Sequence, residues 1–250
     1  MKPLTLFAAI LIIFSACNPK HKDIGKINHL KLVAGDDGKT ISLYKEGFDE
    51  PVLMQHAEND FRPYIHPIVT PDGKGVLTEF SPGHHKHQTG LYWGFTRVNG
   101  RDYFHHPADG YWKKVSADIV EQDGEEVKWQ TVYDMLDEKG NAIMRQTQNW
   151  AITQDSGKYF LTLEWKGEAK TDVTIGKYDY GGLFLRMPWT EGMKAEVINA
   201  ARQKNEKAEG ERAMWVDVGM QVAGRDNMAH IAIFDHPENR GYPQRWRVDG

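Results

Sequence analysis

An alternation of apolar and polar residues with a period of two runs through this chain and limits what it can fold into. Apolar, aromatic and threonine side chains occupy every second position of 127–135, and Lys128, Gln130 and Asp134 lie between them. This pattern is typical of a strand with one buried face. Residues 159–165 repeat it. Shorter runs rich in strand-forming residues stand at 41–44, 52–54, 91–98 and 231–234.

Turn signals separate these runs. Residues that favour tight turns occur at 35–38, 71–73, 122–124, 138–141 and 155–157. Such tips between alternating runs favour antiparallel hairpins. Strands do not alternate with helices, and neither GxGxxG nor a P-loop occurs, which disfavours a parallel nucleotide-binding sheet. We therefore predict an all-β fold, an antiparallel β-sandwich, with residues 30–250 as a single domain.

The composition excludes several other classes. Eight Trp, ten Tyr and ten Phe are too much apolar surface for a disordered chain. The net charge is −4, the pI is near 6.3 and no stripe of Lys and Arg occurs, so nucleic acid is excluded as the expected partner. Residues 200–213 have helix-forming residues, but Gly210 and the many charges there fit a solvated loop equally well.

The first residues resemble an export signal. Met1-Lys2 precedes an apolar run at 4–14, which is too short to span a bilayer, and Ser-Ala then leads into Cys17, the single cysteine. We predict a lipoprotein signal peptide at 1–16, lipidation of Cys17 and a polar tether at 17–29. The protein would then sit on the periplasmic or surface face of a bacterial membrane. The alternative is an ordinary signal peptide with an incidental cysteine.

Histidines are the strongest candidates for chemistry, and most of the eleven lie between positions 56 and 106. His85 and His87 are two residues apart, so in an extended segment they point the same way and can share a proton relay. His66 stands in a second short extended segment. We expect these three imidazoles to converge as acid–base groups. The alternative is that these histidines are ordinary polar side chains on solvent-exposed loops.

A carboxylate is expected from a distant part of the chain. Asp235 and His236 follow an apolar strand, and an adjacent carboxylate and imidazole suit acid–base catalysis. A turn in which Asp235 accepts backbone hydrogen bonds explains the same residues equally well. A further cluster, from Asp102 to His106, has no role assigned to it.

Arginine and aromatic residues are candidates for substrate binding. Arg62 lies four residues before His66, so both project to the same side of an extended chain, and its charge would keep nearby imidazoles neutral. Arg186 occupies a strand position from which it can pair with a carboxylate or hold substrate oxygens; the alternative is an ion pair at the strand edge. Tyr92 and Trp112 can stack on a sugar ring; the alternative for such rings is ordinary core packing.

Metal and nucleophile chemistry have weaker support. Two or three histidines and a carboxylate can hold a divalent metal such as zinc, iron or copper, but the spacing matches neither HExxH nor paired CxxC. No GxSxG motif is present. A divalent metal cofactor therefore stays an alternative.

Four segments resemble a bacterial family labelled methane oxygenase PmoA-like: Arg-Pro-Tyr-Ile-His-Pro at 62–67, His-x-His-x-x-Gly-Leu-Tyr-Trp-Gly at 85–94, Gly-Gly-Leu-Phe-Leu-Arg-Met-Pro at 181–188 and Asp-His-Pro-Glu-Asn at 235–239. The resemblance implies a secreted or lipid-anchored protein that works on carbohydrate. Gln88 and Thr89 depart from the family, in which many members have His and Arg. Members also continue further, which leaves open a C-terminal truncation of this chain.

Together these features predict a lipid-anchored envelope enzyme that acts on a sugar or glycoside through histidine and carboxylate acid–base chemistry. The fold expected by analogy is the sandwich of the aldose mutarotases. The alternatives are a non-catalytic carbohydrate-binding lipoprotein and a metal-dependent oxidase, as the family label suggests.

Overall fold

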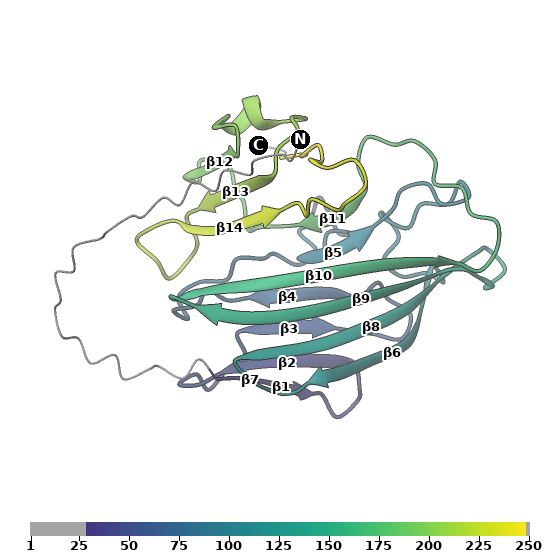
Figure 1. Ribbon diagram of the computed structural model, residues 1–250, viewed down its shortest axis with the longest axis horizontal. Coiled ribbons are helices and arrows are strands. Elements are labelled where there is room, and N and C mark those ends of the chain that lie inside the picture. The colour runs from purple at the N-terminus through teal and green to yellow at the C-terminus, as the bar shows by residue number, and fades with distance from the viewer. Residues whose placement is uncertain (1–28, 249–250) are drawn as a thin grey trace, which may run out of the picture.

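Antiparallel sheets packed face to face form this protein, as the alternation predicts (Figure 1). The computed structural model describes residues 29–248, so the predicted signal peptide and Cys17 lie outside the described residues. Within 29–248, no helix is long and apolar enough to cross a membrane. The prediction of an all-β antiparallel sandwich is confirmed.

The largest sheet has seven strands in the order β11-β5-β4-β3-β2-β1-β7. Its strands are β1 (Leu30–Ala34), β2 (Thr40–Lys45), β3 (Leu53–His56), β4 (Tyr64–Ile68), β5 (Leu91–Gly94), β7 (Asp123–Gly124) and β11 (Gly182–Leu185). The strands β1 to β4 follow one another in sequence and in space, whereas β11 joins β5 after a long excursion of the chain.

A second sheet of four long strands, in the order β10-β9-β8-β6, covers one face of the first. Its strands are β6 (Trp112–Glu121), β8 (Glu126–Leu136), β9 (Ala142–Asp155) and β10 (Lys158–Ala169). A third sheet, β12-β13-β14, is made of β12 (Ala195–Asn199), β13 (Trp215–Met220) and β14 (Ala229–Phe234). The inner faces of all three sheets contribute side chains to one hydrophobic core.

Tryptophan side chains join the two larger sheets. Trp129 of β8 is 1% exposed, stacks on Trp150 and donates a hydrogen bond from Nε1 to Gln55 Oε1 of β3 over 3.1 Å. Trp93 of β5 stacks on Trp165 of β10 with ring centroids 4.7 Å apart. Large rings that pack across the interface bury much apolar surface, and the indole hydrogen bond fixes how the sheets lie.

Two further sequence-based expectations can be compared with the structure, one for the end of a strand and one for a possible helix. The strand expected at 91–98 ends at Gly94. Beyond it, the carbonyl oxygen of Phe95 accepts the N–H of Tyr103, and Val98 forms isolated bridges to Ile175 and Arg101. In the segment 200–213, only the short 3₁₀ helix η1 (Asn205–Ala208) is helical, so the loop interpretation is correct there.

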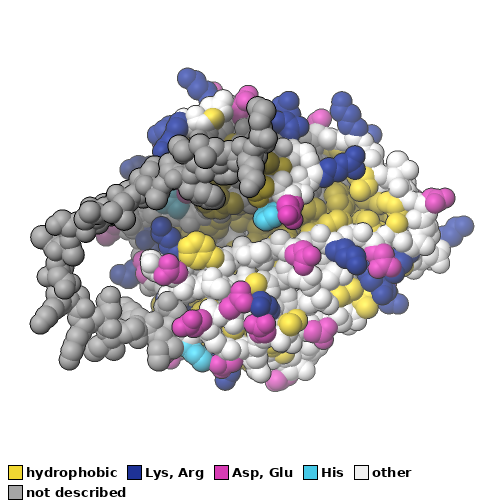
Figure 2. All heavy atoms as spheres, viewed as in Figure 1, with side chains coloured by type: hydrophobic (Ala, Val, Ile, Leu, Met, Phe, Trp, Pro, Cys, Tyr) yellow, Lys and Arg dark blue, Asp and Glu magenta, His cyan; other side chains and the backbone are white. Residues whose placement is uncertain are grey.

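The viewed side of the molecule is that of the four-stranded sheet (Figure 1). On this side, Lys, Arg, Asp and Glu side chains are interspersed, and hydrophobic side chains gather in a hollow band between β10 and the C-terminal strands (Figure 2). The seven-stranded sheet lies behind, so its outer face looks away from the viewer. That outer face carries most of the histidines, as described next.

We expect Trp129→Ala to lower the free energy of unfolding by about 3–5 kcal/mol, because it removes a large buried ring and orphans Gln55 Oε1. Denaturant unfolding followed by fluorescence measures the change. Phe160→Ala is the control: this ring is 52% exposed on the edge strand β10, and its loss should cost about 0.5 kcal/mol or less. Equal losses in the two variants would show that Trp129 does not hold the sheets together.

Candidate functional site

A row of rings crosses the outer face of the seven-stranded sheet. Phe184 of β11 pairs with Tyr92 of β5, Tyr92 with Tyr64 of β4, and Tyr64 with His56 of β3. Because side chains alternate along a strand, these four directly paired residues share one face, and their neighbours face the core. We call this set of four residues the aromatic row.

Two loops lie over the aromatic row, and Arg62 ties both to it. Arg62 is fully buried; its Nη1 donates to the carbonyl oxygen of Phe104 over 2.8 Å and its Nη2 to that of His87 over 2.6 Å. The guanidinium also lies 3.8 Å from the centroid of the Tyr92 ring. Burial lowers the pKa of Arg62 to about 10, so the side chain stays charged at neutral pH. We call residues 81–88 and 102–107 the first and second histidine loops.

Two glycines make room for this arrangement. A Cβ at Gly94 would lie 3.4 Å from Arg62 Nη1 and 3.3 Å from the Phe104 ring, so the absence of a side chain lets the arginine approach the sheet. Gly90 has φ +84°, and a Cβ there would collide with the carbonyl oxygen of Ile65 in β4. Since Gly90 follows the first histidine loop, any larger residue would push that loop away from the sheet.

The second histidine loop holds a carboxylate–imidazole pair. His105 Nδ1 and Asp102 Oδ2 are 2.7 Å apart, and Asp102 Oδ1 accepts hydrogen bonds from the backbone N–H groups of Phe104 and His105. Burial opposes ionisation of Asp102, but the hydrogen bonds from His105 and Phe104 outweigh it and lower its pKa. The carboxylate is therefore ionised at neutral pH, and the bond at Nδ1 leaves His105 Nε2 for another partner.

His87 of the first loop lies against this pair, with its ring 4.6 Å from that of His105 and 4.8 Å from that of Phe104. Burial, followed by the charges of His105, Arg62 and His85, lowers the pKa of His87 to about 4. His87 is therefore a neutral imidazole at pH 7. A neutral imidazole beside one that is oriented by a carboxylate gives the site groups that can accept, donate and hold protons.

A second group of histidines stands at the other end of the aromatic row. His66 Nδ1 lies 2.9 Å from Thr78 Oγ1, and His56 Nε2 donates to the carbonyl oxygen of His66 over 2.8 Å. Burial and the nearby His56 lower the pKa of His66, and burial lowers that of His56. Phe80 covers this end, with its ring 6.0 Å from His66.

Arg186 is engaged within the protein. Its Nε donates to Glu79 Oε2 over 2.9 Å and its Nη1 to Gln88 Oε1 over 3.3 Å. This ion pair is the alternative to a role in holding substrate, and it links the end of β11 to the base of the first histidine loop. Gln88, which departs from the expected histidine, has its own partner there.

The sequence-predicted residues are brought together only in part. His85 and His87 contact each other, with ring centroids 5.7 Å apart, and Arg62 donates to the carbonyl oxygen of His87. His66 shares the same sheet face but contacts Thr78 and Phe80 instead. The Asp102–His105 pair completes the first group; its signal in the sequence was an aspartate three residues before a histidine in a loop, which is the spacing of a turn that caps its own backbone.

Asp235 and His236 form a local turn on the C-terminal sheet. Asp235 accepts hydrogen bonds from Asn239 Nδ2 over 2.7 Å and from the backbone N–H of Gln244 over 2.8 Å, and His236 Nδ1 accepts from the N–H of Glu238. This is the capped-turn alternative, and among residues 29–248 we find no contact that joins the turn to the histidine loops.

Trp112 and Tyr92 are core residues, each 1% exposed, so their predicted role in stacking on a sugar is wrong. Trp112 packs edge-on against Tyr103 and donates from Nε1 to the carbonyl oxygen of His106. Tyr92 is covered by Phe104, Phe184 and the Arg62 guanidinium. Rings with both faces packed have no surface left for a ligand.

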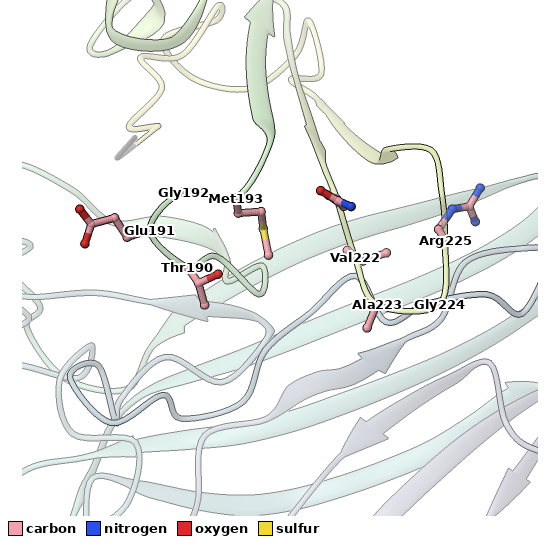
Figure 3. Close-up of a pocket in the computed structure, with 9 residues that line it drawn as sticks. Thr190, Glu191, Gly192, Met193, Val222, Ala223, Gly224 and Arg225 are labelled. Atoms are coloured by element: carbon pink, nitrogen blue, oxygen red, sulfur yellow. The ribbon is translucent and has the colours of Figure 1, made fainter.

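The described residues contain no group of three or more His, Cys, Asp or Glu side chains that could hold a metal ion. A surface cavity of about 430 Å³ lies between the segment 190–193 and the segment 221–225 (Figure 3). Its two charged residues, Glu191 and Arg225, point away from each other, and no histidine lines it. The chemistry-bearing side chains are therefore on the histidine loops rather than in this cavity.

Comparison with known families shows which family the chain belongs to. Residues 32–250 match a family of unknown function, DUF6807, and the protein belongs to that family. The assignment to the methane oxygenase PmoA-like family is therefore wrong. No curated protein and no solved structure matches the chain. The likeness to mutarotase sandwiches stays a prediction.

Protonation of His87 should weaken the fold in acid. In the unfolded chain histidine titrates near 6.5, so between about pH 6.5 and 4 the unfolded state binds more protons than the folded state. The stability that depends on neutral His87 is complete above pH 6.5 and is lost as the pH falls toward 4. We expect the melting temperature of His87→Gln to fall less steeply over this range than that of the wild type.

Thermal melts at constant ionic strength measure this difference. His236→Gln is the control, because it also removes one histidine, an exposed one in the C-terminal turn, and leaves both histidine loops intact. Parallel profiles for His87→Gln and the wild type would contradict the assignment of a neutral His87.

Proposed function

We propose that this protein is a lipid-anchored enzyme of the bacterial cell envelope that acts on a sugar or glycoside by acid–base chemistry. The observation that carries the proposal is the 2.7 Å bond between Asp102 and His105 beside the neutral His87. An imidazole that a carboxylate orients can take up a proton, since the carboxylate stabilises the imidazolium that forms.

The side chains suggest how the proton transfers divide. His105, through Nε2, takes a proton from a substrate hydroxyl and returns it later in the cycle, and Asp102 keeps its ring in one orientation. His87 is neutral and holds a substrate oxygen by a hydrogen bond, as a neutral imidazole does when it polarises a carbon–oxygen bond. His85 lies next to His87 and takes part in holding the substrate.

Aromatic side chains beside the imidazoles support a sugar as substrate. Tyr180 lies edge-on to Phe104 and 6.4 Å from His105, and it is partly exposed; the Arg247 guanidinium lies 4.6 Å from the centroid of its ring. A pyranose has an apolar face of C–H groups and a rim of hydroxyl groups. It therefore fits a site in which ring faces alternate with hydrogen-bonding groups.

We expect His105→Ala to lower kcat/KM by about 10²–10⁴-fold and Asp102→Asn to lower it in the same direction, because general acid–base catalysis contributes this much. The substrate is first found by screening glycosides, including oxidised ones, and by polarimetry for anomer exchange. Binding is measured beside turnover, because the alternative, a non-catalytic carbohydrate-binding lipoprotein, needs only binding.

The chain offers a matched control for these variants. Asp217 Oδ1 and His230 Nδ1 are also 2.7 Å apart, but they lie on β13 and β14 of the C-terminal sheet. Asp217→Asn should leave turnover unchanged. If Asp102→Asn and Asp217→Asn behave alike, or if glycans bind without any turnover that depends on His105, the enzyme proposal fails.

The anchor is tested separately. We expect Cys17→Ser to move the protein from the membrane fraction to a soluble or unprocessed form, since the acyl chains would be lost. Fractionation after a high-salt wash, which removes electrostatic adhesion, measures this. A variant that still sediments with membranes would contradict lipidation at Cys17.

A further inference from the structure

We propose that Phe80 and His66 form a second sugar-binding subsite, so that the ligand has two ring units, as in a disaccharide or an aryl glycoside, rather than one. This inference rests on the proposed function for the chemistry and adds the class of substrate. It follows from what the structure places at the end of the aromatic row away from His105.

Phe80 is a fixed platform with a free side. Its ring stacks on Tyr64 with centroids 5.2 Å apart, and Tyr64 in turn stacks on His56 with centroids 4.5 Å apart and planes 6° from parallel. Tyr64 is 8% exposed, whereas Phe80 is 43% exposed. The lower rings therefore hold the Phe80 ring in place, and solvent reaches a large part of it. An aromatic ring of this kind can bind the apolar face of a sugar.

His66 supplies the polar contact that a hydroxyl-bearing ring needs. Its Nδ1 is bound to Thr78 Oγ1, and that hydroxyl oxygen also accepts the backbone N–H of Ile68 over 3.0 Å. Both contacts fix the imidazole, and the bond at Nδ1 leaves Nε2, on the opposite side of the ring, for another partner. His66 and Phe80 together thus present one hydrogen-bonding atom next to one aromatic face.

The two histidine groups lie over neighbouring strands of the same sheet face. Phe104, which contacts His87 and His105, lies over Phe184 and Tyr92 of β11 and β5, whereas Phe80 lies over Tyr64 of β4. Neighbouring strands are about 4.8 Å apart, so the strands beneath Phe80 and Phe104 are one to two strand spacings apart, roughly 5–10 Å. This separation suits two adjacent ring units of one ligand.

One loop connects both groups. Phe80 pairs with Thr89 at the base of the first histidine loop, and Thr89 Oγ1 lies 3.3 Å from Arg62 Nη2. The loop therefore begins at the Phe80 subsite and ends at the arginine that holds His87. A ligand that contacts both groups would lie along this loop.

The test compares binding of disaccharides with binding of their component monosaccharides by calorimetry, using cellobiose, maltose and lactose against glucose and galactose. We expect the wild type to bind at least one disaccharide more tightly than its components. Phe80→Ala should lower the affinity for that disaccharide about 10-fold, because the apolar surface that the second ring would cover is lost. The affinity for the monosaccharides should stay the same. Phe80→Trp, which keeps an aromatic face, should preserve disaccharide binding.

Phe160→Ala is the matched control, since Phe160 is a phenylalanine of similar exposure on β10. If Phe80→Ala weakens both classes of sugar equally or neither, or if no disaccharide binds more tightly than its components, the second subsite is overturned. The outcome is separate from that of the catalytic proposal. Binding that depends on Phe80 without turnover sustains the subsite and contradicts the enzyme, and turnover that is indifferent to Phe80 does the reverse.

Discussion

The buried guanidinium of Arg62 is the interaction on which the histidine site depends. Among residues 29–248 no carboxylate lies within ion-pairing distance of it, so the charge is stabilised by backbone carbonyl oxygens, the Thr89 hydroxyl and the Tyr92 ring, with a longer-range contribution from Asp102. A buried cation without hydrogen bonds is strongly unfavourable. The two histidine loops must therefore be in position for Arg62 to be buried, and Arg62 must be buried for the loops to be held. The imidazoles are positioned by this mutual requirement rather than by a regular element.

The strands were predictable where one face is apolar and the other polar. The alternation in 127–135 and 159–165 identifies β8 and β10, and the turn signals at 138–141 and 155–157 mark both ends of β9. The strand β9 itself was not predicted, because its inner face carries Gln146 and Gln148, which are buried and accept hydrogen bonds from tryptophan Nε1 atoms. Polar residues on the buried face remove the alternation of apolar and polar residues by which a strand is recognised in the sequence.

The site was predictable only where it is local. His85, His87 and Arg62 stand in dense motifs, and the structure joins them. The pairing of Asp102 with His105 depends on how one loop folds, and its place beside His87 depends on Arg62, which no spacing in the sequence records. The aromatic candidates Tyr92 and Trp112 show the opposite difficulty, since the chemistry of a ring does not reveal whether its faces are packed. The Asp235 turn shows that a carboxylate beside an imidazole is satisfied by its own neighbours when no loop approaches it.

The late position of β11 in the chain has a consequence for folding during synthesis. The strand β5 can pair with β4 as soon as residue 94 has emerged, but its other edge stays open until β11 is made nearly 90 residues later, after the whole of β6 to β10. The four-stranded sheet forms mainly from hairpins close in sequence, so its contacts are local and fast, whereas the β5–β11 contact is among the slowest to form. Until then the chain presents an unpaired strand edge, and the side of the Tyr92 ring that Phe184 later covers is open. A nascent protein of this kind is most prone to aggregate in that interval, when the ribosome has made the histidine loops but not the strand that completes the sheet beneath them.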